Sequence, residues 1–321
     1  MSKKAQTVLH SFFTSPCFDE RRKTMKKIFT RYPKNPILTK EDFPVDTSAV
    51  LNPGAIKTEN EYVLICDVTL AKRHIVLWVA RSQDGIHFVP DEKPIELVSH
   101  PDHPNEICVY DPRIVKLEGR YYITHTSNSI VGDRISLLAT DDFRTFERVS
   151  VSSELNNRNC SLFPEKINGY YCRFGRDEKD LWIEYSPDLH FWGNQRLVMQ
   201  TRETYWDAYK IGAGAPPIKT EHGWLELYHG VYNTCNGYIY NLGVVMLDLE
   251  DPSKVLARSE GPVFYPEESY EWIGRVPGVV FSCNAVLEDD GTVKIYYGAA
   301  DQCIGLAEAK LEDLIDACYH G

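Results

Sequence analysis

Short stretches in which apolar and polar residues alternate, each introduced by a turn, recur along this chain. Such alternation is typical of half-buried β-strands, because successive side chains of a strand point to opposite faces. The copies lie about 50–70 residues apart, a spacing typical of propeller blades made of four short strands. One unit, a turn followed by an aromatic-rich strand, occurs five times: ENEYVLICDV from Glu59, EGRYYITHTS from Glu118, NGYYCRFGRD from Asn168, HGWLELYHGV from His222 and DGTVKIYYGAAD from Asp290.

A second unit follows the first in three copies: RSQDGIHF (81–88), ATDDFRTF (139–146) and YSPDLHFW (185–192). In each copy an Asp turns the chain before an aromatic residue re-enters the sheet. A β-sandwich would also account for short strands, but not for five copies of one strand–turn pattern. The sequence therefore predicts an all-β fold, a five-bladed β-propeller.

Helical periodicity is confined to the two ends of the chain. The segments CFDERRKTMKKIF (17–29) and KLEDLIDAC (310–318) are each expected to form a short helix, so the propeller should carry short helical N- and C-terminal extensions. We divide the chain into a partly helical N-terminal extension over residues 1–30 and a five-bladed propeller domain over residues 31–321. The extension is compatible with self-association into a homo-oligomer.

The innermost strand of each propeller blade lines a central channel, where polar residues converge from all blades. We expect the aromatic-rich strand to be this innermost strand. The channel would then be lined by the polar residues at the strand ends, namely Asp67, Ser127, Asn128, Arg176, His229 and Asp301.

Composition narrows the function classes. The 321 residues are 43% hydrophobic and 25% charged, which is ordinary for a globular chain, and the net charge of -11 disfavours nucleic acid as a partner. No apolar run reaches the ~18 residues of a membrane span, and the N-terminus does not resemble a secretory signal. The nine cysteines form no C-x-x-C pair, so we expect reduced thiols, no metal site and a cytoplasmic location.

Three aspartates are candidates for acid–base chemistry. Asp111 lies in VYDPRIV, Asp67 ends VLICD, and Asp301 ends YYGAAD. Glycosidic cleavage needs a proton donor at the leaving oxygen, and carboxyl groups around an axis can supply it. Any one of them could equally be a turn or strand cap.

A group of cationic and polar residues is more informative in so acidic a chain. Arginine offers paired donors to phosphate oxygens, lysine a point charge and tyrosine a neutral donor. The alternative is that the cations form ordinary ion pairs with Glu165, Asp177 or Asp207. Trp206, Tyr209 and Tyr228 are candidates for stacking on sugars, although blade cores also use aromatic residues. The group that could hold a small dianion consists of Arg158, Arg176, Lys210, His229 and Tyr240.

Together these segments resemble glycoside hydrolase family 130, and the resemblance runs from about residue 35 to the C-terminus. It implies a five-bladed propeller that acts on β-mannosides. Most such enzymes are inverting phosphorylases, and one branch consists of hydrolases that lack the basic phosphate-binding residues. The motifs that carry the resemblance are NPGAI (52–56), YDPRI (110–114), LFPEKINGYY (162–171), KIGAGAPPIKTEHGW (210–224), YHGVYNTCNGYIYNLGVVMLDLEDP (228–252) and YYGAADQCIGLA (296–307).

The resemblance also implies roles for single residues. Asp111 would be the general acid, passing its proton to the leaving oxygen through the mannose 3-hydroxyl. Asn52, Asp67 and Asp301 would contact the mannose of subsite −1. Inorganic phosphate would be the co-substrate, a β-mannoside oligosaccharide the other ligand, and no cofactor would be needed. The implied phosphate-binding residues are Arg158, Asn159, Arg176, Lys210, His229 and Tyr240.

One position departs from the family pattern. Many phosphorylases of the family carry Arg where this chain has Ile65, and Arg73 or His74 could compensate. The linkage (β-1,4 or β-1,2) and the acceptor sugar depend on loops and stay open. The alternatives are an inverting β-mannosidase on the same fold, a five-bladed furanosidase, which the motif order disfavours, and a non-catalytic glycan-binding propeller.

Overall fold

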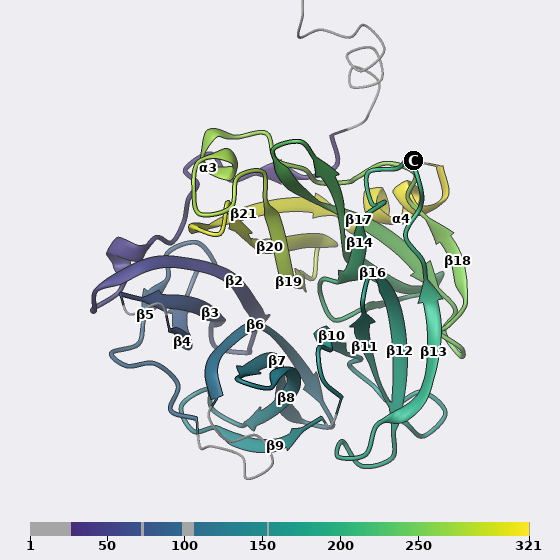
Figure 1. Cartoon of the computed structure of the whole chain (residues 1–321), viewed down its shortest axis with the longest axis horizontal. Helices are drawn as coiled ribbons and strands as arrows, with labels where there is room; N and C mark the ends of the chain where they lie inside the picture. The colour runs from purple at the N-terminus through teal and green to yellow at the C-terminus, as the bar shows by residue number, and fades with distance from the viewer. Residues whose placement is uncertain (1–26, 72–73, 98–105, 153, 321) are drawn as a thin grey trace, which may run out of the picture.

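The five repeats of the sequence form five separate antiparallel sheets arranged around a central axis (Figure 1). The computed structural model describes residues 27–71, 74–97, 106–152 and 154–320. The five-bladed β-propeller is therefore confirmed. The first blade consists of β2 (Thr47–Lys57), β3 (Tyr62–Leu70), β4 (Ile75–Ser82) and β5 (Val89–Pro90), and the second of β6 (Glu106–Leu117), β7 (Arg120–Ser129), β8 (Gly132–Thr140) and β9 (Glu147–Val151). The third blade consists of β10 (Arg158–Leu162), β11 (Tyr171–Asp177), β12 (Asp180–Ser186) and β13 (Gly193–Met199). The fourth consists of β14 (Lys210–Ala213), β16 (Gly223–Thr234), β17 (Gly237–Leu247) and β18 (Val255–Arg258), with β15 (Ile218–Thr220) paired to β16.

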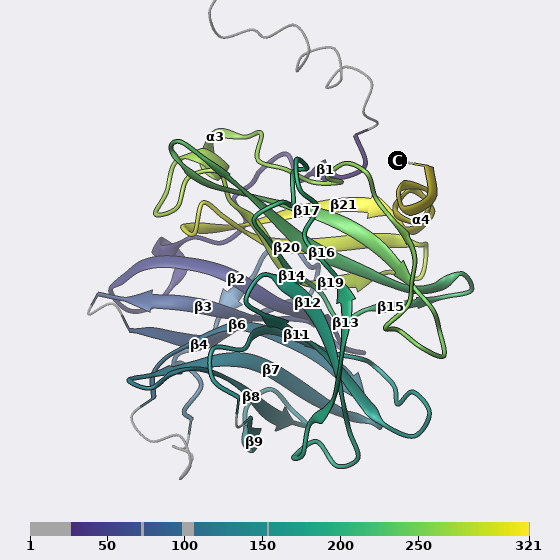
Figure 2. The same cartoon turned by 45° about the vertical axis from the view of Figure 1, so that its right-hand side comes forward.

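The fifth sheet closes the ring with a strand from the N-terminal end of the described chain. It consists of β19 (Val280–Leu287), β20 (Thr292–Ala299), β21 (Cys303–Lys310) and β1 (Thr30–Arg31). Figure 2 shows β1 beside β21, with which it pairs antiparallel. Joining the two ends of the chain in one blade fixes the last blade against the first.

A buried ion pair holds this closing strand in place. Arg31 donates from Nε to Glu271 Oε1 at 2.7 Å and from Nη2 to Oε2 at 2.9 Å. Glu271 is fully buried and also accepts a hydrogen bond from the Tyr297 hydroxyl at 2.8 Å. Because both charges are hydrogen-bonded as well as paired, their desolvation is offset. The contact joins strand β1 to helix α3 (Ser269–Trp272).

The expectation about the innermost strand was wrong. Each aromatic-rich repeat forms the second strand of its blade, and the innermost strands are β2, β6, β10, β14 and β19. The second strands are buried on both faces, because each packs between neighbouring blades. Ile65 and Leu77 of the first blade, for example, pack with Ile114 and Ile123 of the second. The aromatic and β-branched residues of the repeat therefore reflect the core between blades.

The second sequence unit forms the turn between the third and fourth strands, as expected. Its aspartate accepts hydrogen bonds from backbone N–H groups two and three residues later. The three aspartates are Asp84, which bonds residues 86 and 87, Asp142, which bonds residues 144 and 145, and Asp188, which bonds residues 190 and 191, all at 2.8–2.9 Å.

The predicted C-terminal helix is confirmed as α4 (Leu311–His320), which buries Leu314, Ala317 and Cys318. A short 3-10 helix, η1, covers Lys40–Asp42. The helix expected over 17–29 lies outside the described residues except for 27–29, which are not helical. The described part of the chain has no helix long and apolar enough to cross a membrane. Its eight cysteines are all free thiols, six of them buried, as predicted.

Candidate functional site

Three consecutive innermost strands each carry a β-bulge that aims one polar side chain at the axis. The bulged residues are Asn52 on β2, Asp111 on β6 and Asn159 on β10, and the strand register shifts at each of them. All three have left-handed backbone conformations, with φ of 44°, 57° and 58°. Asn and Asp tolerate this conformation better than other non-glycine residues. Bulges of this kind re-aim side chains beside active sites.

The bulges bring their side chains into direct contact around the Asp111 carboxyl group, which is only 7% exposed. Asn52 donates from Nδ2 to Asp111 Oδ1 at 2.8 Å, and Asn159 donates from Nδ2 to Oδ2 at 3.3 Å. The Asp111 backbone N–H donates to both carboxyl oxygens of Asp67, at 2.9 and 3.1 Å. Both the side chain and the backbone of Asp111 are therefore fixed in direction.

The other two predicted carboxyl groups, those of Asp67 and Asp301, are both affected by burial and by the charge of Asp111. Burial, and secondly the charge of Asp111, raise the pKa of Asp67 well above its usual range. The same two causes raise the pKa of Asp301 to about 6, against a smaller lowering by Arg275. Like charges in a site of low polarity disfavour ionisation. A cluster of this kind is typical of acid–base sites.

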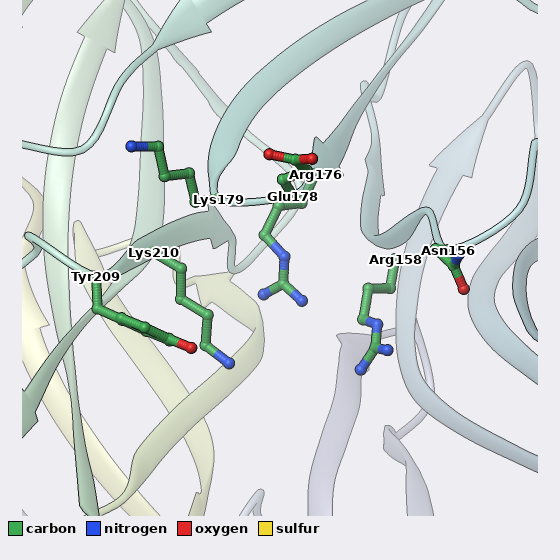
Figure 3. Close-up of a pocket in the computed structure, with 7 residues that line it drawn as sticks. All are labelled: Asn156, Arg158, Arg176, Glu178, Lys179, Tyr209 and Lys210. Carbon is green, nitrogen blue, oxygen red and sulfur yellow. The ribbon is translucent and has the colours of Figure 1, made fainter.

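The predicted cations meet on the adjacent side of the axis, at a cavity of about 450 Å³. Figure 3 shows the guanidinium groups of Arg158 and Arg176 and the ammonium group of Lys210 directed toward one space. Burial and then the charge of Arg158 lower the pKa of Arg176 to about 10. Burial and then Arg176 and Arg158 lower that of Lys210 to about 8. The residues that line the cavity are Asn156, Arg158, Arg176, Glu178, Lys179, Tyr209 and Lys210.

Among the described residues, the predicted cations form none of the alternative ion pairs with Glu165, Asp177 or Asp207. Glu165 pairs with Lys219 at 2.6 Å, and Asp207 pairs with Arg202 and Arg258, each at 2.7 Å. Within the part of the chain that the structure describes, Arg176 and Lys210 form no ion pair with a carboxylate, and Arg158 contacts only Asp133. Three cations that repel one another and have, in that part of the chain, a single carboxylate partner, Asp133, favour the binding of an anion.

His229 and Tyr240 complete this cationic side. His229 is fully buried, and neither ring nitrogen forms a hydrogen bond of good geometry among the described residues, although the Ala213 backbone lies close to the ring. Burial, followed by the charges of Arg176 and Arg113, lowers the pKa of His229 well below its usual range, so the ring is neutral. Burial raises the pKa of Tyr240 to about 12, so its hydroxyl stays a donor. Unsatisfied buried nitrogens are rare and point to a ligand.

Glycine is required where the fourth innermost strand passes this histidine. A Cβ atom on Gly212 would lie 2.6 Å from His229 Cε1 and 3.3 Å from Asn159 Oδ1. Only a glycine allows β14 to approach the imidazole so closely. The sequence motif KIGAGAP therefore reflects close packing of the strand against a side chain that the cation cluster surrounds.

Several residues singled out in the sequence lie elsewhere. Ser127 contacts Glu106, and Asn128 donates to Asp133 at 2.7 Å, so both belong to structural networks. The larger aromatic residues divide between core and site: Trp206 stacks on buried Tyr228, whereas Tyr209 lines the cavity.

Sequence reasoning missed Arg113, which lies two residues after Asp111 on β6 and is 1% exposed. It donates to the carbonyl oxygens of Gly214 at 2.6 Å, Ala213 at 2.9 Å and Asp111 at 2.9 Å. These bonds tie the bulge of the second blade to the innermost strand of the fourth. The available signal was a charged residue inside the apolar run that follows Asp111.

The position that departs from the family pattern is occupied by a core residue. Ile65 is fully buried in the core between the first two blades. Of the two residues expected to compensate, Arg73 lies outside the described residues, and His74 contacts the Ile107 carbonyl oxygen through Nδ1 at 3.2 Å.

Comparison with known proteins agrees with this geometry. The family profile described as β-1,4-mannooligosaccharide phosphorylase, glycoside hydrolase family 130, matches residues 19–320. A 1,2-β-oligomannan phosphorylase of Thermoanaerobacter sp. is 37% identical over 87% of this chain and 95% of its own length. A β-1,4-mannooligosaccharide phosphorylase of Ruminococcus albus is 34% identical over 91% of both chains.

The fold comparison points the same way. The structure of the β-1,2-mannobiose phosphorylase of Listeria innocua in complex with β-1,2-mannobiose superimposes with a TM-score of 0.82 at 27% identity, over 90% of this chain and 99% of that one. Since the family profile covers nearly the whole chain and two relatives exceed 30% identity over most of it, this chain belongs to glycoside hydrolase family 130.

Proposed function

We propose that this protein cleaves β-mannosides with inorganic phosphate, inverting the anomeric centre and releasing α-mannose 1-phosphate. The observation that carries the proposal is the juxtaposition of the fixed Asp111 carboxyl group with a cluster of poorly compensated cations. Asn159 links the two, because it contacts Asp111 and follows Arg158 on the same strand. Inorganic phosphate is the co-substrate, and the reaction needs no cofactor.

Phosphate would be held by Arg158, Arg176 and Lys210, with Asn159, His229 and Tyr240 as neutral partners. A dianion stabilises all three cations, and one of its oxygens would accept a hydrogen bond from the single N–H of neutral His229. Each charge-assisted hydrogen bond contributes about 1.5–3 kcal/mol. The cluster therefore supplies both the binding energy and the orientation of the attacking phosphate oxygen.

Asp111 would act as the general acid in a single displacement. A phosphate oxygen forms a bond to the anomeric carbon while the bond to the leaving oxygen breaks, and the leaving oxygen takes the Asp111 proton through the mannose 3-hydroxyl. Asn52, Asp67 and Asp301 would contact the mannose. Asp67 has a second role, because its carboxyl group holds the Asp111 backbone N–H. General acid catalysis of this kind contributes about 10²–10⁴-fold.

An inverting β-mannosidase is the alternative on the same fold. It would use water and a carboxylate base, and it gives no reason for Arg176 and Lys210 to line one cavity with no carboxylate partner in the described part of the chain. A glycan-binding propeller gives no reason for a proton donor beside an anion site. The free, mostly buried thiols support a reducing compartment, and we infer the cytoplasm.

The test is product analysis with β-1,2- and β-1,4-mannobiose, each with and without phosphate. We expect α-mannose 1-phosphate only when phosphate is present, and the better substrate identifies the linkage, which differs among the relatives. Free mannose released at a rate independent of phosphate would refute the phosphorylase and favour the hydrolase.

A further inference from the structure

The loop between α3 and β19 (residues 273–279) is fixed against the turn that carries Asp301. Val276 donates its backbone N–H to the Ala300 carbonyl oxygen at 3.0 Å. Gly274 lies so close that a Cβ atom there would overlap the same carbonyl oxygen. The loop therefore keeps a constant position relative to the Asp301 carboxyl group.

Arg275 of this loop joins the last blade to the first. Its Nη1 donates to Thr69 Oγ1 at 2.8 Å. Thr69 is 1% exposed and lies two residues after Asp67 on β3, so the two side chains share one face of that strand. The charge of Arg275 also acts on Asp301. Arg275 itself is exposed, which leaves guanidinium N–H groups for a ligand.

The cations that would hold phosphate come from the opposite part of the ring. Arg158, Arg176 and Lys210 lie on the third and fourth blades, whereas Arg275 and its contacts belong to the fifth and first. In an inverting single displacement the nucleophile and the leaving group occupy opposite faces of the anomeric carbon. The departing sugar would therefore extend away from the phosphate cluster, toward the side of the fifth and first blades, to which Arg275 and Thr69 belong.

We propose that Arg275 binds the departing sugar of phosphorolysis, which is the acceptor sugar of the reverse reaction, by donating hydrogen bonds to its hydroxyl groups. The inference rests on the proposed function. Ile65, where many relatives carry Arg, is fully buried between blades and offers no guanidinium group. The guanidinium group on this side of the site comes instead from a loop of the last blade.

The experiment compares the wild type with Arg275→Ala, and with Arg196→Ala as a control that removes an exposed arginine from the outer strand of the third blade. Synthesis is measured with α-mannose 1-phosphate and mannose, and phosphorolysis with the better of the two mannobioses. We expect the KM for mannose to rise about tenfold or more in Arg275→Ala, as loss of a charge-assisted hydrogen bond predicts. The KM values for α-mannose 1-phosphate and phosphate should stay within about twofold, and Arg196→Ala should match the wild type.

An unchanged KM for mannose would overturn the inference, even if the melting temperature fell, because Arg275 would then only tie two blades together. A rise in the KM for α-mannose 1-phosphate alone would also overturn it, since Arg275 would then act on the mannose of subsite −1. If the wild type forms no mannose 1-phosphate at all, the proposed function fails separately. Calorimetric titration of β-1,2- and β-1,4-mannobiose into the wild type and Arg275→Ala then decides whether Arg275 contacts sugar. Weaker binding to Arg275→Ala would support the contact, and equal binding would overturn it.

Discussion

Lys210 should make phosphate binding depend on pH in a range where the other members of the cation cluster keep their charge. Its pKa is lowered to about 8 by burial and by Arg176 and Arg158. The pKa of Arg176, at about 10, and that of Tyr240, at about 12, lie higher, and His229 is neutral throughout. Lys210 therefore changes from about nine-tenths protonated at pH 7 to about one-tenth at pH 9.

The sign follows from linkage. A bound dianion favours the charged ammonium group and raises its pKa, so phosphate binding takes up a proton once the pH exceeds about 8. The contribution of Lys210 to phosphate affinity should therefore be full below this pH and fall by up to about tenfold for each unit above it, until the contact is lost. Replacing Lys210 by Met removes one charge-assisted contact of about 1.5–3 kcal/mol, which weakens phosphate binding about 10- to 150-fold at pH 7.

The assay is calorimetric titration of phosphate into the wild type and Lys210→Met between pH 7 and 9.5. Titration of phosphate itself is common to both proteins, so the ratio of the two Kd values isolates Lys210. We expect this ratio to be large at pH 7 and to fall about tenfold or more by pH 9.5. The matched control is Lys219→Met, which removes an exposed lysine of the same blade that pairs with Glu165. A ratio that does not change with pH would refute the assigned pKa.

Three further substitutions test other parts of the structure. Asp111→Asn should lower kcat at least 10²-fold while the Kd for phosphate stays within a few-fold, and near-normal turnover would remove Asp111 from its role. Gly212→Ala should push His229 aside and raise the Kd for phosphate about tenfold or more, since the new Cβ would lie 2.6 Å from the ring, and unchanged binding would mean that His229 does not contact phosphate. Arg31→Ala leaves the buried charge of Glu271 unpaired and should lower the free energy of unfolding by about 3–5 kcal/mol, with kcat unchanged below the melting transition. Loss of kcat in folded Arg31→Ala would show that the closing strand also shapes the site.

Local features of the fold could be predicted from the sequence because neighbouring residues determine them. Alternation of side chains and recurrence of one strand–turn unit were enough for five blades. Asp84, Asp142 and Asp188 bond backbone groups only two and three residues away, so their turns could be predicted. Asp111 and the cations could be proposed because their residue types and the family motifs lie in the sequence itself.

The arrangement of the site depends on contacts between residues that are far apart in the chain. Which strand is innermost is decided by packing between blades, and the aromatic repeat proved to be the second strand. The direction of Asp111 depends on Asn159, 48 residues later, and the place of Arg275 depends on Thr69, 206 residues earlier. Whether a cation is paired, or whether Ile65 faces a ligand or a core, is likewise a matter of burial and register, which only the closed ring of blades determines.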